Sequence, residues 1–263
     1  MLVQVNKLNV FVATGGKDFD SSLPTILFLH GSGGDHRTWA MQTRWFAFNG
    51  FSVLAPDLPG HSLSDGNAFE TIEESAEWLE KFLKYIGVDK VHLVGHSQGF
   101  LTALVYAEKN SKAVSSITAI GTAAEIPVNE HLIKTAEVNR DKAAEMMCNW
   151  GFGPYAHKGI SSVPGMQPIG ISRAIMKNNP LAVDLRACAA FKRGNDISKK
   201  LSMDRHCILA SHDKMTPMKA GLLLAKNMSI VPTVIENAGH MLPIEAPKKT
   251  LNALRQFIET IER

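Results

Sequence analysis

The sequence predicts an α/β protein in which a mostly parallel sheet is covered by helices and carries a helical insertion. Two observations lead to this fold class. Short apolar runs bounded by Gly or Pro alternate with longer runs whose apolar residues recur every three or four positions. Strands that alternate with helices pair in parallel through right-handed crossovers, and these crossovers place helices against the sheet.

The first half of the chain supplies a hairpin and three buried strands. Within residues 3–12, apolar and polar residues alternate on either side of Asn6-Lys7, which predicts two half-buried strands joined by a tight turn. Each predicted helix in this half ends at Gly, a frequent helix stop. The other predicted elements of this half are strands at 25–31, 52–58 and 91–95 and helices at 38–50 and 71–87.

The second half repeats this alternation only after an interruption. Residues 124–200 contain helical patches but no convincing strand, so we expect a helical cap inserted into an α/β core made of residues 1–123 and 201–263. Within the cap, a Gly- and Pro-rich segment separates the two patches. The predicted elements are strands at 114–121, 206–213 and 232–239, helices at 217–227 and 246–262, and cap patches at 131–150 and 178–191.

Composition and charge exclude several classes of partner. Of the 263 residues, 45% are hydrophobic and 20% are charged, which is typical of a folded protein. The formal charge of +3 is small and scattered, so no nucleic-acid partner is expected. No run approaches the roughly 18 apolar residues that cross a bilayer, and the N-terminus lacks the pattern of a signal peptide. We expect a cytoplasmic protein with no membrane span. The sequence does not decide whether it forms a homo-oligomer.

The three cysteines do not form a recognisable metal or disulfide pattern. Cys148, Cys188 and Cys207 are odd in number, widely spaced and lack a CxxC pair. We therefore expect buried free thiols in a reducing compartment and no metal site.

A candidate nucleophile lies in GHSQG. Gly95-His96-Ser97-Gln98-Gly99 follows a buried strand directly and opens a helix, which is the context of a nucleophile elbow. Such a turn places the serine at the carboxyl edge of the sheet, where open α/β sheets bind ligands. The alternative, a serine that only shapes a turn, is excluded if a base and an acid lie at neighbouring strand ends.

His240 and Asp213 are the candidate base and acid. Each follows a predicted strand of the second half, and the order Ser, Asp, His is the one this arrangement uses. Two alternatives remain: Asp213 is an N-cap only, or Glu125 supplies the acid. His96 is expected to point away from the site, because adjacent side chains on a strand face opposite sides.

Two backbone N–H groups are candidates for an oxyanion hole. Gln98 follows the nucleophile, and Ser32 lies in the glycine-rich loop HGSGG at 30–34. His30, at the start of this loop, is expected to hold the loop through hydrogen bonds to the backbone.

Together, HGSGG, APDLPGHSLSDG, GHSQG, SHDKMTP and AGHMLPIEAP resemble, in this order, the motifs of the α/β-hydrolase family with a helical cap. The resemblance implies an eight-stranded mostly parallel sheet, a pocket between sheet and cap, and neither a metal nor an organic cofactor. It assigns no substrate residues in the cap. The residues that match the family's functional positions are Ser97, Asp213 and His240, with Ser32 and Gln98 for the oxyanion.

These residues predict a carboxylesterase-like serine hydrolase. Ser97 attacks a small carboxylic ester that has an apolar group, and an acyl-enzyme intermediate forms. Phe100, Trp150 and Met147 are the expected pocket residues. A carbon–carbon bond hydrolase, lactonase, amidase, cofactor-free haloperoxidase or lyase would use the same triad, and a non-hydrolytic ligand receptor is a further alternative.

Overall fold

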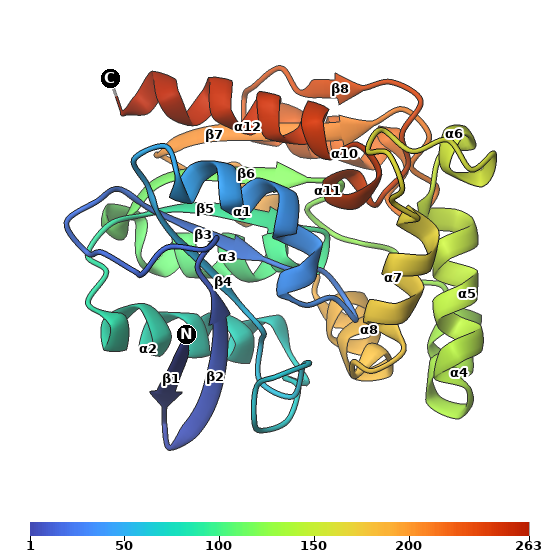
Figure 1. Ribbon diagram of the computed structural model, residues 1–263, viewed down its shortest axis with the longest axis horizontal. Helices are drawn as coiled ribbons and strands as arrows, with labels where there is room; N and C mark the ends of the chain where they lie inside the picture. Colours follow the sequence, from blue (N-terminus) through green and yellow to red (C-terminus); the bar gives the residue numbers. More distant parts are fainter. Residues whose placement is uncertain (263) are drawn as a thin grey trace.

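Eight strands form one sheet in the computed structural model, which describes residues 1–262 (Figure 1). The spatial order is β1-β2-β4-β3-β5-β6-β7-β8. The β1–β2 and β2–β4 pairs are antiparallel and the other neighbours are parallel, which confirms the predicted eight-stranded, mostly parallel sheet. The strands are β1 (Leu2–Val5), β2 (Leu8–Ala13), β3 (Thr25–Leu29), β4 (Ser52–Pro56), β5 (Val91–His96), β6 (Val114–Ile120), β7 (Asp204–Ala210) and β8 (Thr233–Ile235).

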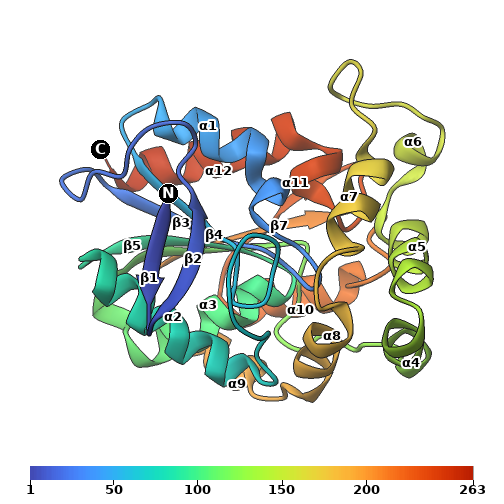
Figure 2. The ribbon, with the colours of Figure 1, turned by 60° about the horizontal axis from the view of Figure 1, so that its bottom comes forward.

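Two apolar layers cover the sheet, as its alternating side chains require. In β3, Ile26 and Phe28 pack in one cluster and Leu27 and Leu29 in the other. Helices α1 (Ala40–Ala47) and α12 (Pro247–Ile261) cover the first face, and α2 (Ile72–Ile86), α3 (Gln98–Lys109) and α10 (Met218–Asn227) cover the second (Figure 2). No helix within residues 1–262 is long and apolar enough to cross a membrane.

Local chemistry explains several of the predicted boundaries. Asn6 and Lys7 have φ of 51° and 69°, the left-handed pair that a tight hairpin turn needs. At the start of α2, Thr71 accepts a hydrogen bond from Glu74 N (3.1 Å), and the Glu74 side chain accepts one in return from Thr71 N (3.2 Å). The helix ends at Gly87, whose φ is 78°.

Six helices between β6 and β7 make up most of the predicted cap. The first five lie together beyond one edge of the sheet (Figures 1 and 2), whereas the sixth packs against α3 and α10 on the second face of the sheet. The patch predicted at 131–150 is two helices, because Asn139 is extended and its side chain caps the second by accepting from Lys142 N (3.0 Å). Helix α7, which begins at a proline, was not predicted from the sequence. The cap helices are α4 (Glu130–Val138), α5 (Arg140–Gly151), α6 (Pro154–His157), α7 (Pro168–Met176), α8 (Leu181–Ala190) and α9 (Gly194–Ser198).

Three short helices complete the chain. These are the 3-10 helices η1 (His36–Trp39) and η2 (Ser111–Ala113), and α11 (Leu242–Glu245). The division into a core and a cap at residues 123/124 and 200/201 remains a proposal.

The turn from β5 into α3 depends on two glycines. A Cβ on Gly95 would lie 2.4 Å from Phe100 N and Cα, and a Cβ on Gly99 would lie 2.3 Å from the carbonyl oxygen of Leu29. Both contacts involve main-chain atoms, which cannot move aside without disturbing the strand or the helix. The start of α3 can therefore lie this close to the sheet only because these positions are glycine.

We predict that Gly99→Ala destabilises the fold by about 1–3 kcal/mol, because the new methyl group forces α3 away from β3. Urea denaturation measures the loss. The control is Gly170→Ala in α7, where a Cβ would meet only Gln167 Cβ at 3.7 Å. Alanine favours a helix, so this variant should be at least as stable as wild type. Equal stability of the two variants would contradict the packing argument.

Candidate active site

Ser97 occupies the turn between β5 and α3 in a strained conformation. Its φ of 53° and ψ of −122° lie in a sparsely populated region for a residue with a side chain. Hydrogen bonds on both sides hold it there. Ser97 N donates to Ile120 O (3.1 Å), and Ser97 O accepts from Thr122 Oγ1 (3.0 Å). The turn directs the Ser97 side chain into a cavity at the carboxyl edge of the sheet.

Asp213 and His240 form a buried pair beside this cavity. His240 Nδ1 donates to Asp213 Oδ2 (2.9 Å). Asp213 Oδ1 accepts from Met215 N and Thr216 N (2.8 Å each), and Thr216 Oγ1 donates to Oδ2 (2.7 Å). The carboxylate therefore does more than cap a helix, because one of its oxygens orients the imidazole.

The electrostatics of the pair fix the state of the imidazole. Burial by itself raises the pKa of Asp213, but the attraction and hydrogen bond of His240 and the bonds from Thr216 outweigh it, and the net pKa is lowered. An ionised Asp213 only accepts hydrogen bonds, so Nδ1 of His240 carries the proton. Nε2 is then left as a base that can accept one.

Glu125, the alternative acid, does not contact His240. Its Oε1 instead accepts from Asn195 Nδ2 (2.8 Å). Of the two candidate acids, the structure brings only Asp213 to the imidazole.

Ser97 and His240 line the same cavity without a hydrogen bond between their side chains. Within residues 1–262, neither Ser97 Oγ nor His240 Nε2 has a hydrogen-bond partner. Hydrogen bonds of this kind are often long in unliganded sites and shorten when substrate binds. Both atoms are thus free to engage a substrate and each other.

A hydrogen bond between their side chains joins the residues of the two candidate oxyanion donors. Ser32 Oγ donates to Gln98 Oε1 (2.7 Å), which joins the glycine-rich loop to the residue after Ser97. Among residues 1–262, no protein oxygen accepts from the main-chain N–H of Ser32 or Gln98. Gln98 is also the first residue of α3, where free N–H groups and the helix dipole favour negative charge.

Two cap residues hold the glycine-rich loop from above. Asp184 Oδ2, on α8, accepts from Gly33 N (2.7 Å) and from His61 Nε2 (2.9 Å). Asn179 Nδ2 donates to Gly33 O (3.0 Å) and Gly34 O (2.9 Å). Asp184 occupies the Gly33 N–H and Gly31 O accepts from Gly34 N (2.9 Å), so neither of these N–H groups is available to a substrate, whereas that of Ser32 is. Neither cap residue was predicted to have a role, since no motif marks them.

His61 completes this contact between cap and core. Burial by itself lowers its pKa, but the charge of Asp184 and the hydrogen bond to it outweigh burial, and the net pKa is raised. The hydrogen bond links the DLPGH loop to α8, and the raised pKa favours the charged form of His61.

His30 and His96 both serve the site by binding main-chain atoms. His30 Nδ1 donates to Gly31 O (3.0 Å) and its Nε2 accepts from Leu58 N (3.2 Å), the supporting role that the sequence predicts. His96 lines the cavity, so the prediction that it points away is wrong. The chain turns sharply at Ser97 and the alternation of the strand ends there. His96 Nε2 donates to His240 O (2.9 Å), and the two rings lie 4.8 Å apart.

The cavity has a volume of about 380 Å³ and lies between the sheet edge and the cap. Met147 and Trp150, two of the expected pocket residues, line it. Phe100 does not: it is 0% exposed and packs in the core, because the first turn of α3 directs it between helix and sheet. The lining includes Lys214 but no acidic residue. An uncharged or anionic ligand with apolar groups is therefore favoured.

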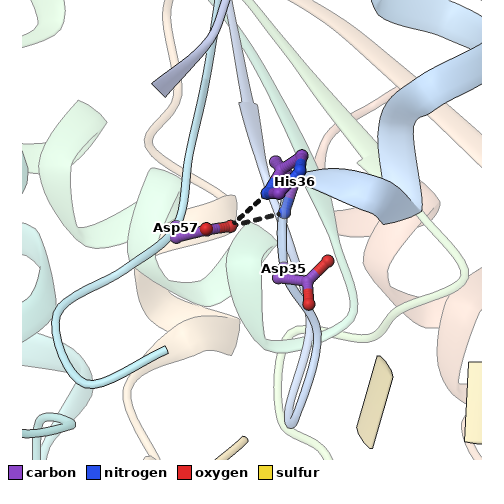
Figure 3. A group of neighbouring side chains, drawn as sticks. All are labelled: Asp35, His36 and Asp57. Carbon is purple, nitrogen blue, oxygen red and sulfur yellow. Dashed lines mark hydrogen bonds and ion pairs between the residues drawn. The ribbon is translucent and has the colours of Figure 1, made fainter. Parts of the chain in front are cut away.

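A second cluster of polar side chains stabilises the loop after β3 (Figure 3). Asp57 Oδ1 accepts from both His36 N and His36 Nδ1 (2.8 Å each). Asp35 binds Arg37 through both of its oxygens. Although Asp35, His36 and Asp57 are close enough to share a cation, these bonds engage their ligand atoms with protein partners. The cluster positions η1 and the glycine-rich loop.

Known proteins are similar to this chain along most of its length. A family model described as the alpha/beta hydrolase fold matches residues 24–147. The 3-oxoadipate enol-lactonase 1 of Acinetobacter baylyi is 24% identical over 243 residues, which are 91% of this chain and 90% of that protein. A 2-hydroxy-6-oxononadienedioate/2-hydroxy-6-oxononatrienedioate hydrolase of Dechloromonas aromatica is 34% identical over 109 residues, 40% of this chain and 38% of that protein.

Solved structures share the whole fold. The enol-lactonase of Burkholderia xenovorans has a TM-score of 0.84 at 19% identity and covers 98% of this chain and 100% of its own. A thermophilic esterase of Thermogutta terrifontis has a TM-score of 0.85 at 20% identity over 100% of this chain and 99% of its own. Together with the family model and the motifs above, these likenesses show that the chain has the α/β-hydrolase fold.

We predict that His96 makes the protein sensitive to acid. Burial and the nearby His240 lower its pKa to about 3 from 6.5, so between these values the unfolded chain binds a proton that the folded chain does not. Stability should therefore fall as pH drops below 6.5, by up to about 1.4 kcal/mol per pH unit from this group. His96→Gln keeps an N–H for His240 O but does not titrate. Urea denaturation at pH 4 to 7 should show a shallower slope in the variant; identical slopes would contradict the prediction.

Proposed function

We propose that the protein is a serine hydrolase that cleaves a small carboxylic ester. One observation carries the proposal: the hydrogen-bonded Asp213–His240 pair opens onto the same cavity as Ser97, beside the unpartnered N–H groups of Ser32 and Gln98. This supplies a nucleophile, a base oriented by an acid, and two donors for a developing oxyanion.

The reaction proceeds in two halves. His240 Nε2 takes the proton of Ser97 Oγ while Oγ bonds to the ester carbonyl carbon, and the N–H groups of Ser32 and Gln98 stabilise the oxyanion. When the oxyanion collapses, the alkoxide leaves with the proton from His240. Water then gives a proton to Nε2 and its oxygen attacks the acyl-enzyme carbonyl. The acid is released as Ser97 Oγ recovers its proton from His240.

A lactonase is the second candidate. The enol-lactonase of Acinetobacter baylyi matches 91% of this chain, and a lactone is an internal ester that the same groups would open. The match to the carbon–carbon bond hydrolase covers 40% of the chain, so it favours that reaction less. No observation of its own favours the amidase, haloperoxidase, lyase or receptor.

The cysteines support the proposal of a cytoplasmic protein that works without a thiol nucleophile. Cys148, Cys188 and Cys207 are free and buried. Burial raises the pKa of each thiol, to about 11 for Cys148 and about 12 for the other two. The thiols therefore remain protonated at neutral pH and are poor nucleophiles.

We predict that wild-type protein hydrolyses p-nitrophenyl esters and that Ser97→Ala lowers kcat by at least about 10³-fold. Asp213→Asn should lower kcat by about 10³- to 10⁴-fold, because the imidazole loses its orienting charge and tautomer. The measurement is steady-state hydrolysis of esters of increasing acyl length, alongside a lactone and an amide.

The matched control is Glu125→Gln, which removes the charge of the other candidate acid and should change kcat by no more than about twofold. Circular dichroism establishes that each variant is folded. Full activity of Ser97→Ala, or a larger loss in Glu125→Gln than in Asp213→Asn, would overturn the assignment. A lactone cleaved much faster than every ester would favour the second candidate.

A further inference from the structure

A serine hydroxyl in the cap is buried without a hydrogen-bond partner. Ser172 lies on α7 and is 0% exposed, and its Oγ has no partner within residues 1–262. A helical serine can satisfy its hydroxyl on the carbonyl four residues earlier, but Ser172 does not. Burying an unpaired hydroxyl costs stability, so its presence here points to a partner that comes from outside the chain.

The helix presents this residue to the active-site cavity. Ser172 lines the cavity together with Ile175 and Met176, three and four residues further along. Residues at this spacing share one face of a helix. The face of α7 that carries Ser172 is therefore the face that closes the cavity.

Contacts to the glycine-rich loop fix the position of α7. Asn179, just after the helix, binds the carbonyl oxygens of Gly33 and Gly34, and also Ile175 O in the last turn (3.1 Å). A Cβ on Gly33 would lie 3.4 Å from Met176 Cγ. The Ser172 hydroxyl is thus held in a fixed place relative to the candidate oxyanion donors.

We propose that Ser172 is a substrate-recognition residue whose hydroxyl donates to an oxo oxygen on the apolar part of the substrate, under the cap. The inference rests on the proposed function and narrows its substrate class to oxo-substituted esters or lactones. A carbonyl oxygen only accepts hydrogen bonds. A hydroxyl substituent could pair with Ser172 Oγ, but one of the two O–H groups would then lack an acceptor among the apolar side chains of Ile175, Met176 and Leu185, and a carboxylate would place a charge against them.

The test compares pairs of p-nitrophenyl esters that differ only in a keto group. These are pentanoate and 4-oxopentanoate, hexanoate and 5-oxohexanoate, and heptanoate and 6-oxoheptanoate. At the chain length that reaches Ser172, wild type should cleave the oxo ester with a kcat/KM about tenfold above that of its parent, equal to about 1.4 kcal/mol. In Ser172→Ala this preference should disappear, so that the oxo ester and its parent are cleaved with the same kcat/KM.

Ser198→Ala is the matched control. Ser198 is as deeply buried, but its Oγ donates to Asn195 O (3.1 Å), and it does not line the cavity. Its loss should lower Tm by about 2–4 °C and leave the oxo preference intact. Ser172→Ala removes an unpaired hydroxyl, so its Tm should not fall. Wild type without an oxo preference at any length, or a preference that survives in Ser172→Ala, would overturn the proposal.

A binding measurement separates this inference from the proposed reaction. Ser97→Ala cannot form the acyl-enzyme, and Trp150 in the cavity wall reports occupancy by its fluorescence. The oxo ester should bind Ser97→Ala about tenfold more tightly than its parent, and equally tightly once Ser172→Ala is added. That result would support recognition of the oxo group by Ser172 even if the wild-type protein cleaves no ester. Equal binding of both esters to Ser97→Ala would contradict it even where hydrolysis is normal.

Discussion

The close contact between β5 and α3 at Ser97 is the constraint on which the rest of the site depends. The Gly95 and Gly99 positions allow the helix to begin directly against the strands, and Ser97 between them adopts a conformation that an unsupported serine would avoid. Hydrogen bonds with Ile120, on the neighbouring strand β6, and with Thr122, in the loop after it, stabilise Ser97 in this conformation. One turn therefore exposes the hydroxyl and leaves the Gln98 N–H free beside it.

The cap is part of this machinery as well as a cover for the cavity. Asp184 and Asn179 hold the glycine-rich loop, in which the Ser32 N–H has no acceptor among residues 1–262. Below the imidazole, Glu245 accepts from Gly239 N and from Gly153 N of the cap (2.8 Å each). Burial raises the pKa of Glu245 despite these bonds. Because cap residues bind both the glycine-rich loop and the loop that carries His240, the part of the protein that selects substrate is physically linked to the part that positions the candidate catalytic groups.

Local signals in the sequence were enough to predict the sheet, most helices and the candidate triad. GHSQG, the strand periodicities and the positions of Asp213 and His240 after strands are all readable in short windows. Failures occurred where packing or local chain geometry, rather than periodicity, decides the outcome. The burial of Phe100 depends on the packing of α3 against the sheet, whereas the break at Asn139 and the inward position of His96 follow from a local cap and a local turn that periodicity does not reveal. Asp184, Asn179 and Ser172 carry no motif, so only the fold reveals what they contact.

The central claim is that Ser97 Oγ becomes covalently acylated, and mass spectrometry of quenched protein tests it directly. Wild type mixed with p-nitrophenyl butanoate and quenched in acid within milliseconds should carry one butanoyl group in place of one hydrogen, on the peptide that contains Ser97. Ser97→Ala should carry none. Two results would contradict the acylation of Ser97. One is an adduct on any other residue. The other is steady turnover by a variant that deacylates slowly, such as Asp213→Asn, with no adduct at any quench time.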